Sequence, residues 1–360
     1  MRIAVLGSGA GGCAVAFDFA AHGHQVRLFD FESFGETVAK IRKTGGIRAE
    51  GVLEGFGPVQ SAGHDIEESL DGAAIIFVVG PAYSTRPFAE ACRPHLKKGQ
   101  TVIICPGSSG GAIEFKKGAG LELKDVDTRV AETSTLPYAV RSQEPGQVRI
   151  FLKLRGGLFI AALPARNTVQ VLDAIRDVYP HMAAAKNILQ TSLQNGNPVI
   201  HPAITLLNAA LIERTGGDFF FYEDGVTPAV GRLIEAVDRE RIAIGRALGV
   251  DILPDPELAQ QQGYMDEISY DRGYALAPGF KGIKAQTQLD YRYFNEDVGY
   301  GLVFMSQLGA QVGVETPHMS ALMRLSSTMM NRDYLKEAKR TMDSLGLSRY
   351  TAEQLVSLLE

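Results

Sequence analysis

The chain has 360 residues, of which 45% are hydrophobic and 21% charged, and its formal net charge is −5 at pH 7. This composition is typical of a globular protein with about two domains of roughly 150 residues each. The acidic balance, without a long Lys/Arg block, argues against nucleic acid or an anionic membrane as the main partner. No apolar run reaches the roughly 20 residues that a membrane-spanning helix needs.

Three cysteines, Cys13, Cys92 and Cys105, lie far apart in the sequence and form no C-x-x-C pair. An odd number of isolated cysteines fits a reducing compartment, so we expect a cytoplasmic protein. We interpret each thiol as a small buried apolar group rather than a nucleophile. The seven histidines show no metal-ligand spacing, and we expect no metal site.

The N-terminal segment predicts a dinucleotide-binding turn. Residues 2–6 indicate a short buried strand, and "GSGAGG" follows it in the G-x-G-x-x-G spacing, before a helical stretch. The first glycine permits the tight turn, the second lets the backbone approach a pyrophosphate, and the third lets the helix pack on the strand. Free N–H groups at the helix start favour the negative phosphates. The predicted cofactor-binding residues of this turn are Gly7, Ser8, Gly9, Ala10 and Gly12.

Asp30 ends the second predicted strand, "HQVRLFD", where a carboxylate can accept both ribose hydroxyls of the adenosine half. The same carboxylate repels a 2′-phosphate. We therefore expect NAD rather than NADP as the cofactor, with NADP left as the alternative. Arg27 points to the other side of this strand and contributes little to binding a phosphate.

Strands and helices continue to alternate through the first half of the chain. Strands are predicted at 73–80, at 101–107 and within 129–164, and helices at 87–96, from 112 and at about 167–178. This alternation predicts a parallel, doubly wound Rossmann-type sheet over residues 1–182. Because ligands bind at the carboxyl ends of such strands, we place Gly80, Pro81 and the segment 105–107 beside the cofactor.

The second half, residues 183–360, predicts an all-helical domain that carries the substrate and the chemistry. Residues 228–250 have the apolar spacing of a long amphipathic helix, and 295–309 indicate another. Thr316 is a predicted N-cap followed by proline at the first helical position, which opens a helix to about residue 330. We expect a cleft between the two domains.

Three polar residues stand out in this apolar half. His201 precedes Pro202, which we interpret as the start of an apolar helix, so that the histidine lies at its mouth. Arg292 lies just before a predicted helix, and Asp297 falls in its first turn, where the helix dipole favours an acid. Each also fits an ordinary role: a hydrogen-bonded histidine, a surface charge and a helix-start acid. Their spacing does not show that they meet.

Motifs spread over essentially the whole chain give these residues more weight. They include "GSGAGG", "CPGSSGGAIEF", "ETSTLPYAVRSQEPGQV", "TSLQNGNPVIHPAITLLNAA", "YEDGVTPAVG", "VDRERIAIGRALG" and "RYFNEDVGYGLV". With these motifs the sequence resembles the opine dehydrogenases, in particular those of the bacterial N-(1-D-carboxyethyl)-L-norvaline dehydrogenase type. The resemblance implies NADH-dependent condensation of an amino acid with a 2-oxo acid, usually pyruvate, through an imine, and it implies a homodimer.

The same resemblance assigns roles to residues of this chain. The histidine of the "HP" motif, His201, becomes the acid–base, and the aspartate of "EDV", Asp297, its partner. Arg292 becomes the ligand of the oxo-acid carboxylate. The amino-acid-facing segment of the family falls on Glu132, Thr133 and Tyr138, where a structural role fits equally well.

Two other functions stay open from the sequence. One is a simple 2-oxo-acid or ketone reductase of the same wider group, which needs no amine. The other is a non-catalytic NAD(H) sensor. The amine donor is not specified, although the lack of a basic-substrate signature favours an apolar or neutral amino acid. The aromatic run at 217–225 favours protein core or a domain-interface wall over an amino-acid side-chain pocket.

Overall fold

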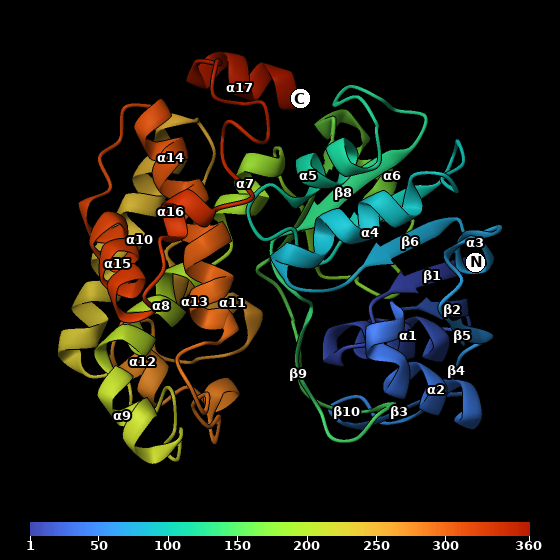
Figure 1. The fold of residues 1–360 in the computed structure, drawn as a ribbon, viewed down its shortest axis with the longest axis horizontal. Helices are drawn as coiled ribbons and strands as arrows, with labels where there is room; N and C mark the ends of the chain where they lie inside the picture. Colours follow the sequence, from blue (N-terminus) through green and yellow to red (C-terminus); the bar gives the residue numbers. More distant parts are fainter. The chain divides into compact units, whose positions relative to one another are not determined.

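The computed structural model describes residues 1–360, which divide into two compact units (Figure 1). The first unit comprises residues 1–191 with 358–360, and the second comprises residues 192–357. The sequence-based boundary at residue 182 falls at the start of β12 (Met182–Ala184), the last strand, which belongs to the sheet of the first unit. No helix has the length and apolarity to span a membrane.

The core of the first unit is an eight-stranded sheet in the order β12-β11-β8-β7-β6-β1-β2-β5. Its strands are β1 (Arg2–Leu6), β2 (Gln25–Phe29), β5 (Ser61–Gly63), β6 (Ile75–Val78), β7 (Thr101–Ile104), β8 (Arg129–Thr133), β11 (Leu158–Leu163) and β12. From β1 the chain crosses to β2 on one side, and from β6 it crosses to β7 and β8 on the other. The order therefore reverses between β1 and β6, and the carboxyl ends of these two strands frame the ligand crevice of such sheets.

The expected parallel sheet is correct for most neighbouring strands, but β11 runs antiparallel to β8. The reason is a second sheet that the sequence did not predict, in the order β4-β3-β10-β9. Its strands are β3 (Gly46–Gly51), β4 (Gly55–Pro58), β9 (Tyr138–Ser142) and β10 (Gln147–Lys153). The chain leaves the main sheet after β8 to form β9 and β10. It re-enters at the edge where β8 ended, so β11 runs in the opposite direction.

Helices cover the sheets of the first unit. They are α1 (Ala10–Ala21), α2 (Gly35–Thr44), α3 (Ile66–Leu70), α4 (Thr85–Cys92), α5 (Gly111–Gly118), α6 (Thr168–Asp173) and α7 (Ile188–Leu193), with 3-10 turns η1 (Glu32–Phe34), η2 (Ala82–Ser84) and η3 (Ala165–Asn167). Right-handed crossovers on either side of β1 place α1 and α4 on opposite faces of the main sheet. Helix α1 is apolar and almost wholly buried, because it also packs against the second sheet.

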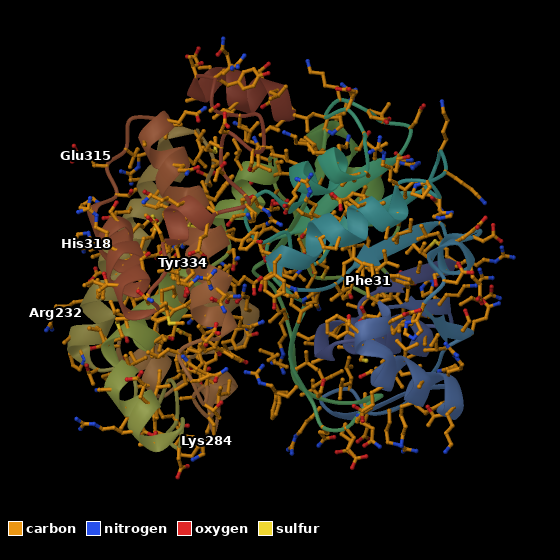
Figure 2. The ribbon with its side chains drawn as sticks, viewed as in Figure 1. Phe31, Arg232, Lys284, Glu315, His318 and Tyr334 are labelled. Atoms are coloured by element: carbon orange, nitrogen blue, oxygen red, sulfur yellow. The ribbon has the colours of Figure 1, made fainter.

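The second unit is helical, as expected (Figure 1). Its elements are α8 (Asn197–Leu207), α9 (Ala209–Thr215), α10 (Pro228–Ala247), α11 (Asp255–Gln262), α12 (Arg272–Ala275), η4 (Pro278–Phe280), α13 (Arg292–Asn295), η5 (Asp297–Leu302), α14 (Val303–Gln311), α15 (Pro317–Met329), α16 (Tyr334–Glu337) and α17 (Ala352–Leu359). The long amphipathic helix α10 is close to its predicted bounds. His318, labelled in Figure 2, lies in the first turn of α15, where the backbone N–H groups of His318 and Met319 donate to the carboxylate of Glu240, which caps the helix.

Two local predictions in this unit are wrong. Helix α8 begins at Asn197, so Pro202 does not start it, and His201 lies inside the helix rather than at its mouth. Pro198 is the proline of the first turn, and Pro202 interrupts the helix interior, where its nitrogen cannot donate to the carbonyl four residues earlier. The single helix predicted at 295–309 corresponds to η5 followed directly by α14, so its first part is π-helical rather than α-helical, and α13 is a separate short helix before it.

Candidate active site

The glycine turn after β1 has the geometry that a bound pyrophosphate requires. Gly7 has φ +115°, and a Cβ on it would collide with the carbonyl of Val79 at the end of β6. A Cβ on Gly12 would collide with the Gly7 carbonyl, which explains the close approach of α1 to this turn. At Gly9, the N-cap of α1, a Cβ would meet nothing within 4 Å. The turn therefore presents bare backbone and a helix N-terminus to open space, which fits a dinucleotide phosphate.

Asp30 lies directly after β2, beside this turn, and its side chain is buried. One carboxylate oxygen accepts from the Ser8 N–H at 2.6 Å and from the Ser8 hydroxyl at 2.7 Å, and the other accepts from the Phe31 N–H at 2.8 Å. These donors hold the carboxylate at the carboxyl edge of the sheet, where the ribose of an adenosine binds in this fold. Arg27 points away from it and donates to the carbonyls of Glu68 and Asp71.

An aromatic wall beside Asp30 was not predicted from the sequence. Phe31, labelled in Figure 2, stacks on Phe88 of α4, with ring centroids 5.1 Å apart and planes inclined by 27°. Gly80 and Pro81 follow β6 at the same edge, and a Cβ on Gly80 would overlap the Ser84 side chain. The only signal in the sequence was an aromatic residue directly after the acid.

The residues predicted to face the amino acid separate into two places. Glu132 and Thr133 end β8, and Glu132 is fully buried. Its carboxylate accepts from the N–H of Ala112 at 2.8 Å and from the Thr191 hydroxyl at 2.7 Å, so it ties α5 and α7 to the sheet. Beside it, the loop after β7 holds Ser108 and Ser109 at positive φ, a strained conformation that often accompanies ligand sites.

Tyr138 is not beside Glu132 and Thr133. It begins β9 in the second sheet, and its hydroxyl donates to the carboxylate of Asp18 at 2.6 Å and pairs with the hydroxyl of Tyr179 at 2.8 Å. Burial holds the pKa of Tyr138 well above its ordinary value, with the neighbouring Tyr179 adding to the effect. In this arrangement Tyr138 links α1 to the second sheet.

The three cysteines are buried, as expected. Burial raises the pKa of Cys13, Cys92 and Cys105 to about 12, so each thiol stays protonated at neutral pH. A protonated thiol is a poor nucleophile. No group of three or more His, Cys, Asp or Glu side chains is arranged to hold a metal ion.

In the helical unit, His201 and Asp297 form a buried pair. The Nδ1 atom of His201 lies 2.8 Å from Oδ2 of Asp297, although the two residues are 96 positions apart in the sequence. Both side chains are about 95% shielded from solvent. With the aspartate ionised, it can only accept, so Nδ1 carries the proton and Nε2 is left as the basic nitrogen.

Close packing between two elements produces this contact. Asp297 begins the π-helical turn η5, which packs against α8, the helix that carries His201. A Cβ on Gly301 of η5 would overlap the ring of Pro198, so the glycine permits the two backbones to approach. A π-helical turn is rare, and such turns occur frequently at functional sites.

Arg292 is linked to His201 by the ring of Tyr293, which contacts both side chains. It is the first residue of α13 and is exposed, and its guanidinium carbon lies 5.7 Å from the ring centroid of Tyr293. The Tyr293 ring in turn stacks on His201, with centroids 4.0 Å apart and planes inclined by 27°. The structure thus brings together all three residues that the resemblance singled out.

Burial and the charge of Arg292 together determine the pKa of the Asp297 carboxyl. Burial raises the pKa of its carboxyl to about 7, and the positive charge of Arg292 limits the rise. The carboxyl of Asp297 therefore changes protonation close to neutral pH, which suits a site that exchanges protons with a substrate.

One further side chain at this site was not predicted. Tyr222 places its hydroxyl 3.1 Å from Nε2 of His201. The aromatic run that contains it is mostly core, as the sequence favoured, since Phe219, Phe221 and Tyr222 are buried and Phe220 is exposed. Nothing in the sequence pattern separated the hydroxyl of Tyr222 from its apolar neighbours.

A glycine turn that fits a dinucleotide in one unit and a buried His–Asp pair in the other are features expected of an NAD(P)-dependent oxidoreductase, and the comparisons with known proteins show that class. Two family models match the corresponding parts of the chain. Residues 2–119 match the N-terminus of NAD-dependent glycerol-3-phosphate dehydrogenase, and residues 184–330 match the alpha-helical domain of NAD/NADP octopine/nopaline dehydrogenase. The chain is 37% identical to the opine dehydrogenase of Arthrobacter sp. (strain 1C), over 99% of this chain and 98% of that protein. Within its class, the chain belongs to the opine dehydrogenase family.

Solved structures of octopine dehydrogenase share the fold. The complex of that enzyme with NADH and L-arginine has a TM-score of 0.79 at 17% identity, and the complex with NADH and pyruvate has 0.78 at 18%. Each comparison covers 99% of this chain and 98% of the other. The predicted fold class, a Rossmann-type domain followed by a helical domain, is confirmed.

Proposed function

We propose that this chain catalyses the NADH-dependent reductive condensation of an amino acid with a 2-oxo acid, and that pyruvate is the oxo acid. The observation that carries the proposal is the buried 2.8 Å contact between His201 and Asp297. Family membership supports it, as do the structures of octopine dehydrogenase with L-arginine and with pyruvate. The product is a secondary amine that carries two carboxylates.

His201 acts as the acid–base in this proposal. Its basic Nε2 takes a proton from the ammonium group of the amino acid, which frees the lone pair to attack the carbonyl carbon. The resulting carbinolamine loses its hydroxyl as water when the imidazolium returns the proton, and a protonated imine remains. Asp297 holds the required tautomer and stabilises the imidazolium, as the acid of a catalytic triad does.

Arg292 binds the carboxylate of the 2-oxo acid. A guanidinium presents two parallel N–H donors that match the two oxygens of a carboxylate. Two contacts support this role: the guanidinium of Arg292 lies over the ring of Tyr293, and that ring stacks on His201.

Bound NADH supplies the hydride that reduces the imine carbon. The open backbone at Gly9 and the N-terminus of α1 would hold its phosphates, with Gly80 and Pro81 at the same edge of the sheet. The carboxylate of Asp30 would hold the adenosine ribose and would disfavour the 2′-phosphate of NADPH. We expect a higher kcat/KM with NADH than with NADPH.

The remaining substrate contacts and the assembly are also proposals. Glu132, Thr133 and Tyr138 stay candidates for the amino-acid side, and an apolar or neutral amino acid stays the expected amine donor. A homodimer is expected from the family, and light scattering on the purified chain tests it. A cytoplasmic location stays a prediction.

A panel of amino acids, each supplied with pyruvate and NADH, tests the proposed reaction through the absorbance of NADH. We expect oxidation of NADH that depends on one class of amino acid. Oxidation with pyruvate alone, at the same rate, indicates a simple oxo-acid reductase instead. Tight NADH binding without turnover on any pair indicates a sensor.

The variant His201→Ala tests the acid–base assignment. We expect kcat to fall by about 10²–10⁴-fold, because that is the usual contribution of a positioned acid–base. The Kd for NADH, measured by fluorescence titration, should stay unchanged. His181→Ala, which removes an exposed histidine of the first unit, is the matched control. A His201→Ala enzyme that keeps most of its kcat contradicts the assignment.

A further inference from the structure

The hydroxyl of Tyr222 lies within hydrogen-bond distance of Nε2 of His201, the nitrogen through which the histidine acts in the proposed function. Nδ1 of His201 faces Asp297 at 2.8 Å, and Nε2 faces the Tyr222 hydroxyl at 3.1 Å. With the proton on Nδ1, the neutral imidazole can only accept at Nε2, so the phenol donates to it. The order Asp297, His201, Tyr222 is therefore a continuous chain of hydrogen bonds.

The phenol ring is held in this place from several sides. It stacks on Phe280 at 4.2 Å with planes inclined by 13°, and Phe280 stacks on Tyr264 at 4.7 Å. The ring of Phe221 meets it edge-on at 5.1 Å. Tyr222 itself is only 5% exposed. Moving the ring away from His201 would break this packing, so a substrate does not displace it at low cost.

The imidazole is also covered on its faces. Tyr293 stacks on it at 4.0 Å, and Phe221 lies against it at 6.1 Å with planes inclined by 63°. His201 is 4% exposed. The imidazole is thus shielded on its faces, and the polar group that lies against its Nε2 is the hydroxyl of Tyr222.

We propose that Tyr222 is a further catalytic residue, whose hydroxyl relays protons between the substrate and His201. The inference rests on the proposed function, because it assigns a route to the proton that His201 exchanges there. In the first step the substrate ammonium gives a proton to the Tyr222 oxygen as the phenol gives its own to Nε2. In the second step Nε2 returns a proton to the Tyr222 oxygen, and the phenol protonates the departing hydroxyl, which leaves as water. Tyr222 is a neutral phenol before and after each step.

The variant Tyr222→Phe removes the hydroxyl and keeps the ring in its stack. We expect kcat to fall by about 10²-fold or more, with the Kd for NADH unchanged and only a small fall in the thermal unfolding midpoint, because Nε2 loses one hydrogen-bond donor. Tyr264→Phe, which removes a hydroxyl from the same aromatic stack, is the matched control and should retain its kcat. Retention of more than about a third of kcat by Tyr222→Phe, or a gain in kcat, overturns the relay.

A second readout separates a relay from a merely structural hydroxyl. Two protons that move together give a bowed dependence of the single-turnover rate on the deuterium fraction of the solvent, whereas one proton gives a straight line. We expect a bowed dependence for the wild-type enzyme and a straight line for the residual activity of Tyr222→Phe. A straight line for the wild-type enzyme overturns the relay.

A third variant covers the case in which Tyr222→Phe does not fold. Replacing Tyr222 with 3,5-difluorotyrosine keeps the ring and the hydroxyl but lowers the pKa of the phenol. We expect the alkaline limb of the kcat profile to shift to lower pH, and an unshifted profile overturns the relay. Assay of His201→Ala in parallel separates the two proposals. Loss of activity in His201→Ala with full activity in Tyr222→Phe rejects the relay alone, and full activity in both rejects the acid–base assignment.

Discussion

The helical unit contains two buried clusters in which an aspartate contacts a basic side chain. The basic residue is a histidine in one cluster and an arginine in the other. In one, Asp297 faces His201, a base that can lose its charge. In the other, Asp238 faces Arg241, which never does, and both side chains are fully buried. A pair that can change protonation suits catalysis, and a pair that cannot suits architecture.

The arginine cluster shows what the architectural case looks like. Arg241 of α10 also donates to the carbonyls of Leu193 and Leu253, at 2.6 and 2.7 Å, and so fixes two segments that precede α8 and α11. Asp238 accepts from the Asp255 N–H at 2.8 Å and from the Tyr270 hydroxyl at 2.6 Å. Every polar group named here has a partner, and none is left to meet a substrate. Burial alone therefore does not identify the functional carboxylate.

The largest expected effect comes from neutralising Asp297, the carboxylate of the proposed acid–base pair. Asp297→Asn should lower kcat by about 10²–10⁴-fold, because the imidazolium loses its counter-charge and the histidine its tautomer. The free energy of unfolding at pH 8 should stay level or rise, since burial disfavours the charged form that is removed. Asp255→Asn is the matched change in the arginine cluster, and its kcat should stay close to wild type. A kcat within tenfold of wild type for Asp297→Asn would place the two clusters in the same class.

A change in the arginine cluster should have the opposite signature. Arg241→Leu leaves the charge of Asp238 buried without a cation, which costs about 3–5 kcal/mol of unfolding free energy. Urea denaturation measures this loss, and kcat per folded molecule should stay near wild type. The double variant with Asp238→Leu should recover part of the stability, because no uncompensated charge remains. A single variant as stable as wild type contradicts the architectural role.

The smallest expected effect is on the pH dependence of stability. Burial, with the charge of Asp238, raises the pKa of Asp255 to about 6, and burial raises that of Asp297 to about 7. Both lie above the ordinary value of 3.8, so each group favours folding while it is protonated. This contribution is complete below the unfolded pKa and is lost as the pH rises through the folded pKa. We expect the unfolding free energy to fall by on the order of 1–3 kcal/mol between about pH 5 and about pH 8.

The variants Asp255→Asn and Asp297→Asn show which carboxyl causes each part of the fall in unfolding free energy with pH. Asp255→Asn should remove the limb near pH 6, and Asp297→Asn the limb near pH 7. Urea denaturation at each pH provides the measurement. A curve that is flat over this range in the wild-type protein rejects the raised pKa of both groups.

The sequence by itself determined the features that depend on near neighbours in the chain. The spacing of Gly7, Gly9 and Gly12 and the place of Asp30 after the second strand predicted the cofactor turn, because tight turns and strand ends are local. The apolar period of α10 predicted that helix for the same reason. The roles of His201, Asp297 and Arg292 came from resemblance to a family, and no spacing in the chain showed that they meet.

Only the tertiary structure decided which distant side chains touch. It placed His201 inside α8 and set Asp297 against it, and it brought the hydroxyl of Tyr222 to Nε2 from an aromatic run that looks like plain core. It also showed that Tyr138 lies in the second sheet, where its hydroxyl donates to Asp18. These contacts arise when separate elements pack, as where Gly301 lets η5 approach Pro198. Local periodicity records which face of an element is buried, but it does not record what that face meets.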